Sequence, residues 1–137
     1  MNSKKSQISI EYLIIIGFVT FVIIGILGVA FFYSGTITDR IKMNQIDGFA
    51  EKIISSSESV FYSGSPSKLT ISAYLPEGVE EIEVQPESIL FTVQTNSGIN
   101  KISFSSKVPL AGNIPNSPGV KRIKLEATVS ALVISPA

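Results

Sequence analysis

One uninterrupted apolar segment, from Tyr12 to Tyr33, dominates the pattern of hydrophobic and polar positions along the chain. The segment carries no charge and is apolar on every face, whereas a helix on the surface of a soluble domain keeps a polar side. At about 1.5 Å per residue it forms a helix of about 33 Å, which matches a hydrocarbon layer of about 30 Å. The pattern therefore predicts a membrane-spanning helix over residues 12–33.

A second pattern follows the span, where an apolar stripe shows intervals of three and four across Ile46, Phe49 and Ile53 and resumes at Val60. The stripe consists of Ile37, Ile41, Ile46, Phe49, Ile53, Ile54, Val60 and Phe61. It predicts an amphipathic continuation, so that one long helix occupies residues 7–61, with weak points at Gly35 and Gly48. We expect the stripe to pack on the chain's own C-terminal domain, after a linker over residues 62–67.

Beyond the linker the hydrophobic period changes to two, which is typical of half-buried strands. The expected strands are 68–75, 79–85, 88–95, 99–105 and 120–134. The alternation places Ile123, Val129 and Val133 on one face of the last strand. The predicted fold class is α+β: a long N-terminal hydrophobic helix is followed, over residues 68–137, by a small antiparallel β-sheet or sandwich domain of about five strands.

The flanks of the span set its expected orientation. Lys4 and Lys5 stand just before it, and positive flanks stay cytoplasmic, so the C-terminal domain is expected outside the cell. A cleaved secretory signal has an apolar region of about 7–15 residues that ends in small residues. Here the apolar run is longer and ends in Phe31, Phe32 and Tyr33, so the span is expected to be retained.

Composition narrows the classes of function. The 11 basic and 11 acidic residues cancel, so no basic field is present to attract nucleic acid, and no nucleic-acid partner is predicted. The chain has no cysteine and no histidine, which excludes a structural zinc site and nucleophilic catalysis of the Ser-His or Cys-His type. We therefore expect no enzyme, no catalytic residue and no cofactor.

Five glutamates form an acidic cluster around one predicted hairpin: Glu77, Glu80, Glu81, Glu83 and Glu87. Such a cluster could bind a cation such as calcium. However, no loop of spaced Asp and Asn ligands accompanies it, and the strand alternation places several of these side chains in solvent. A solvated surface is the favoured interpretation, and no metal site is predicted.

The residues just before the span carry the most specific pattern. Glu11 lies at the edge of the apolar run, where a carboxylate is costly unless a cation pairs with it, although a first-turn position also suits the helix dipole. Gln7, Ser9, Glu11 and Tyr12 follow Ser6 and the two leader lysines. This arrangement resembles the class III signal peptide of archaeal type IV pilin-like proteins, and it matches their Gln-x-Ser-x-Glu-Tyr motif at every named position.

The resemblance covers residues 4 to about 33 and implies a specific processing route. A prepilin peptidase would cut between Ser6 and Gln7, so that residues 1–6 are a leader and Gln7 becomes the new N-terminus. In the wider type IV pilin family the glutamate equivalent to Glu11 pairs with the N-terminal amine of a neighbouring subunit. The resemblance also implies other pilin subunits, a pilus assembly ATPase and a membrane platform protein as partners, with the membrane holding the subunit before assembly.

The sequence thus leads to a filament-subunit hypothesis, in which the span becomes part of a helical bundle and the β-domain is displayed on a surface filament. The alternative is a membrane-anchored extracytoplasmic binding module, or a minor pilin or adhesin, that uses the same export signal without forming the bulk filament. The C-terminal domain shows no exposed aromatic cluster or ligand motif that separates the two.

Overall fold

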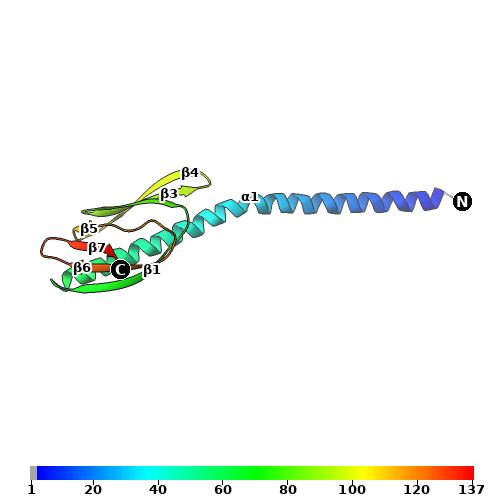
Figure 1. Ribbon diagram of the computed structural model, residues 1–137. Coiled ribbons are helices and arrows are strands. Elements are labelled where there is room, and N and C mark those ends of the chain that lie inside the picture. The colour runs from blue at the N-terminus through cyan, green and yellow to red at the C-terminus, as the bar shows by residue number, and fades with distance from the viewer. Residues whose placement is uncertain (1–2) are drawn as a thin grey trace. The chain divides into compact units, whose positions relative to one another are not determined.

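The computed structural model describes residues 3–137, and it describes side chains from Gln7 onwards. The chain divides into two compact units, Met1–Thr38 and Asp39–Ala137. The helix α1 (Ser3–Tyr62) is continuous and belongs to both (Figure 1). The residues at both expected weak points, Gly35 and Gly48, are helical, so neither of them ends the helix.

The second unit contains seven strands in two sheets. The first sheet, in spatial order, consists of β1 (Lys68–Leu75), β6 (Gly119–Ala127), β7 (Leu132–Pro136) and β5 (Leu110–Gly112). The second consists of β2 (Val79–Gln85), β3 (Ser88–Thr95) and β4 (Gly98–Ser105). All pairs are antiparallel except β5 with β7. The predicted class, a long apolar helix followed by a small sheet domain, is confirmed, with seven strands in place of about five.

The expected last strand, 120–134, is wrong as a single element. A turn at Thr128 separates β6 from β7, because the Thr128 Oγ1 hydroxyl donates to the Ala131 carbonyl at 2.6 Å and accepts from the Ala131 amide at 3.2 Å. The turn also changes which side chains face inward. Val129 is 96% exposed, and Leu132 is buried in place of the expected Val133.

The second half of α1 supplies one wall of the core. Ile46, Phe49 and Ile53 are buried together with inward residues of both sheets, which confirms the expected packing of the stripe. Phe91 on β3 links this wall to the second sheet, because its ring contacts Phe49 edge-to-face with centroids 6.1 Å apart. Figure 1 shows the two sheets on either side of this part of α1.

The N-terminal end of the stripe does not join the core. Ile37 and Ile41 are 56% and 53% exposed, contrary to expectation. Polar residues occupy the inward side of α1 at this level: the carboxylate of Asp39 accepts from the Asn96 amide at 3.1 Å, and Lys42 donates to the Gln94 carbonyl at 3.2 Å. The helix therefore meets the β3–β4 hairpin through hydrogen bonds here, and Ile41 is turned outward.

Candidate functional site

The residues of the predicted processing motif lie in the first turns of α1. Gln7, Ser9, Glu11 and Tyr12 are all exposed. Ser6 is helical in its backbone, and its side chain lies outside the described part of the chain. Because residues four apart share a face of a helix, Gln7 and Glu11 lie one above the other, with Ile15 next along the same row. Two of the four motif residues thus form a short polar row that leads directly into apolar surface, whereas Ser9 and Tyr12 lie on other sides of the helix.

Glu11 is exposed at the start of this apolar surface. Among the side chains from Gln7 onwards, the two ion pairs both involve Glu126, and none involves Glu11. Once water is removed from around it, a carboxylate needs a positive partner to remain charged. The geometry therefore leaves Glu11 available to a cation that another molecule would bring.

The apolar surface itself is large and uncovered. Every large hydrophobic side chain between Ile8 and Tyr33 is exposed. The helix is long and apolar enough to cross a membrane, and no part of its most apolar stretch is buried inside the protein. Lipid or other apolar helices can remove such a surface from water.

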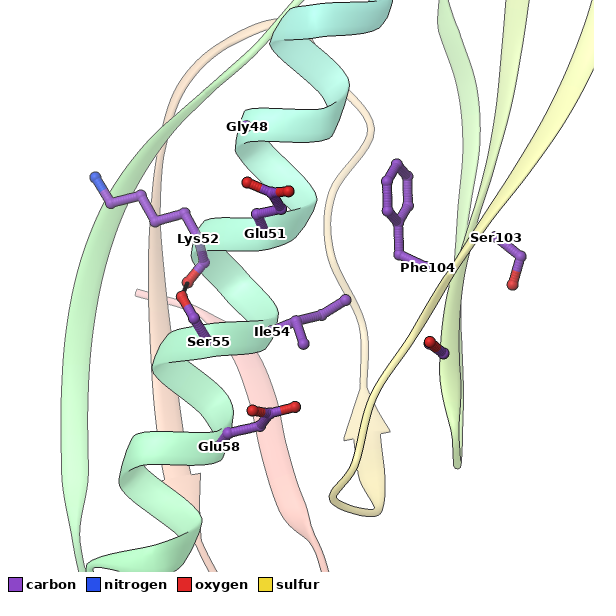
Figure 2. Close-up of a pocket in the computed structure, with 9 residues that line it drawn as sticks. Gly48, Glu51, Lys52, Ile54, Ser55, Glu58, Ser103 and Phe104 are labelled. Atoms are coloured by element: carbon purple, nitrogen blue, oxygen red, sulfur yellow. Dashed lines mark hydrogen bonds between the residues drawn. The ribbon is translucent and has the colours of Figure 1, made fainter.

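A groove runs between α1 and the edge strand β4 in the second unit, with a volume of about 710 Å³ (Figure 2). Ile54 from the helix and Phe104 from the strand point toward each other across it. The carboxylate groups of Glu51 and Glu58 belong to its helical wall. Lys52, which also lines the groove, points away from Phe104 and donates to the Ser72 carbonyl on β1 at 2.6 Å.

The groove was not predicted from the sequence. The sequence places Ile54 in the helical stripe and Phe104 in the predicted strand 99–105, but neither pattern places the two elements opposite each other. A sheet edge beside a helix depends on long-range packing, and no local spacing signals it. Sequence reasoning therefore found the N-terminal motif and missed the groove.

The acidic cluster lies at the surface. All five glutamates of the predicted hairpin, from Glu77 to Glu87, are exposed. Within residues 3–137, no group of three or more acidic side chains is arranged to hold a metal ion. Among known proteins, no family model, no curated protein and no solved structure matches the chain.

Proposed function

We propose that this chain is the structural subunit of an archaeal type IV pilus-like surface filament. It is exported as a prepilin, cut by a prepilin peptidase between Ser6 and Gln7, and polymerised through the apolar part of α1. The observation that carries the proposal is the uncovered apolar part of α1, up to Tyr33, which follows the motif residues Gln7, Ser9, Glu11 and Tyr12. No catalysis by the subunit is required.

Assembly follows from two properties of the helix. The apolar surface leaves lipid only if other apolar helices cover it, so the spans of many copies pack together as the core of the polymer. Glu11 enters that core with a charge that needs compensation. Cleavage before Gln7 creates an α-amine, and the amine of one copy pairs with the Glu11 carboxylate of the next.

The division of the chain supports this role. Residues 39–137 form a compact unit whose core includes only the second half of α1. The β-domain therefore keeps its packing whether the span lies in lipid or in a filament. A subunit that moves from one environment to the other needs this independence.

The most direct test is mass spectrometry of the native protein from its own cells. An N-terminus at Gln7 is expected from cleavage by a prepilin peptidase. A protein that retains Met1 or Asn2 as its N-terminus would contradict the processing step and leave a plain membrane anchor.

A second test separates insertion from assembly. Glu11→Ala should enter the membrane as the native chain does, because an uncharged helix start costs nothing in lipid, yet filaments should be absent or disordered. Asp47→Ala is the matched control, since it removes an exposed carboxylate from the second half of α1. Normal filaments from Glu11→Ala would overturn the assigned role of this residue.

The groove between α1 and β4 favours one second candidate, a membrane-anchored binding module or a minor pilin or adhesin. Its volume lies within the range of about 300–1,000 Å³ that is common for ligand sites. The two candidates differ in abundance and location. A major pilin dominates sheared surface filaments, whereas a binding module stays with the membrane fraction.

A further inference from the structure

The outward side chains of the β1–β6 pair form an exposed surface: Thr70, Ser72 and Tyr74 on β1 and Val120 and Arg122 on β6 are all exposed. Ile71, Ala73 and Leu75 of β1 are buried, so the alternating residues of that strand point outward. Across from them on β6, Ile123 and Leu125 are buried in the same way. The outward pairs, in register, are Lys68–Glu126, Thr70–Lys124, Ser72–Arg122 and Tyr74–Val120.

This surface combines positive charge with apolar area, and we call Lys68, Tyr74, Val120, Arg122 and Lys124 the basic face. Tyr74 and Val120 lie directly across from each other and are 49% and 71% exposed. Arg122 is exposed on the diagonal from Tyr74. Tyr and Arg are among the residue types enriched at the centres of protein interfaces.

The basic face keeps a positive balance despite one internal carboxylate. Glu126 accepts from Lys68 at 3.0 Å and from Lys124 at 3.3 Å. Three cations against this one carboxylate leave a net charge of +2 on the face. Among the described residues, Arg122 makes no ion pair, so its charge is available to another molecule.

The opposite sheet carries the complementary charge. Ile82 on β2 is buried, so Glu81 and Glu83 on either side of it point outward. Glu77 and Glu87 are exposed in the turns at the two ends of β2. We call these four residues the acidic face; Lys101 on β4 is the cation on the same outer surface, which leaves a net charge of −3.

The two faces belong to different sheets that lie on either side of α1 (Figure 1). One copy therefore cannot bring its own basic face against its own acidic face. Two copies can do so, and each then still has one free face. A contact between two different faces of identical subunits repeats from copy to copy and, unless it closes into a ring, builds a helical array.

We infer that the basic face of one copy docks on the acidic face of the next copy, as a lateral contact between β-domains. This inference rests on the proposed filament function and adds a second contact outside the bundle of spans. The charges favour this orientation and disfavour like-on-like contacts. Tyr74 and Val120 supply the apolar area that a contact made of surface charges alone would lack.

The test is a charge exchange in cells that produce the full chain. Arg122→Glu with Lys124→Glu reverses the basic face, and Glu81→Lys with Glu83→Lys reverses the acidic face. Each double variant should lower the yield of sheared filaments by about tenfold, because like charges then meet. Combining all four substitutions restores opposite charges and should restore most of the yield.

Two controls accompany the exchange. Lys101→Glu makes the acidic face more negative and should leave the filament yield undiminished. Resistance of the β-domain to proteolysis in each variant shows that it remains folded. High salt should also break native filaments into shorter pieces, because it screens the attraction between the basic and acidic faces. The Debye length falls from about 10 Å at 0.1 M to about 3 Å at 1 M.

The outcomes separate the two proposals. Absence of filaments from the unmodified chain overturns the proposed function. If the unmodified chain forms filaments and both double variants form them in normal yield, the docking of the two faces is wrong while the filament function stands. If the double variants are folded and combining all four substitutions does not restore the filament yield, the docking of the two faces is also wrong.

Discussion

Phe91 joins the helix to the second sheet, and its removal is the most informative perturbation of the β-domain. The side chain is fully buried on β3. Its ring makes edge-to-face contacts with Phe49 of α1, at 6.1 Å, and with Phe104 of β4, at 5.6 Å. Phe91→Ala therefore empties a site to which three elements contribute.

The magnitude follows from burial and ring contacts. A Phe→Ala substitution in a core lowers the free energy of unfolding by about 3–5 kcal/mol. Each aromatic pair contributes about 0.5–1.5 kcal/mol to such a loss. Because Phe91 makes two such pairs, we expect the loss for Phe91→Ala in the upper part of this range, at about 4–5 kcal/mol. Domains of this size are stable by about 5–15 kcal/mol, so much of the stability would be lost.

Phe104→Ala is the matched control. Phe104 is only partly buried and shares one ring contact, with Phe91. Its loss should lower the free energy of unfolding by about 2 kcal/mol. The double variant should lose less than the sum of the two single losses, by about 0.5–1.5 kcal/mol, because the ring pair disappears only once.

The assay is pulse proteolysis of the full chain in a mild detergent across a urea series. A short protease pulse digests the unfolded β-domain and spares the folded one, so the fraction folded gives the free energy of unfolding. If Phe91→Ala lost less than about 2 kcal/mol, or no more than Phe104→Ala, the role of Phe91 as the link between helix and sheet would be refuted.

The same assay tests three further expectations. Gly112 and Gly119 both have positive φ, but a Cβ at Gly112 would overlap a carbonyl of β7 whereas one at Gly119 meets open space. Gly112→Ala should therefore lower the free energy of unfolding by at least about 2 kcal/mol more than Gly119→Ala does. Equal losses would contradict this. Ser57 has a buried hydroxyl with no hydrogen-bond partner within the described residues, so Ser57→Ala should gain about 1 kcal/mol, and a clear loss would indicate a hidden partner. The hydrogen bond from Lys68 lowers the pKa of Glu126. The ionised Glu126 therefore stabilises the folded domain above the ordinary carboxyl pKa, and this contribution is lost as the pH falls through the lowered pKa. The stability difference between the native chain and Glu126→Gln should therefore shrink with acidification, and a constant difference would argue against the ion pair.

Local pattern was sufficient for the elements whose pairing is local. The hairpins from β2 to β4 were predicted nearly residue for residue, because alternation and short turns determine them together. The strand β5 was missed for the opposite reason. Its three residues, Leu110–Gly112, are too few for a period, and they pair in parallel with a strand that follows about twenty residues later.

The break between β6 and β7 shows a different limit. Apolar residues alternate through Ala127, Val129 and Ala131, so the sequence reads as one strand. The Thr128 hydroxyl closes a turn in the middle of that alternation. The hydrogen bonds between Thr128 and Ala131, two through the hydroxyl and one between backbone groups, thus override a continuous hydrophobic pattern, and the pattern alone cannot reveal them.

The candidate site divides along similar lines. The motif around Glu11 is contiguous, so the sequence displays it in full, and the structure adds that its residues are exposed on one helix. The basic face was not visible, because Tyr74 and Arg122 are almost fifty residues apart in the chain. Only the register of β1 against β6 brings them side by side.

The position of the second half of α1 between the two sheets has a mechanical consequence. Asp39, Lys42, Lys52 and Glu58 each hydrogen-bond to backbone of the β-domain, and they are spread over about 30 Å of helix. A force along the axis of this part of α1 acts on all four hydrogen bonds at the same time. It also acts on the apolar contacts of Ile46, which lies between them. They would have to fail together under shear, so a tethered domain of this kind should resist extraction by tension far better than its free energy of unfolding suggests.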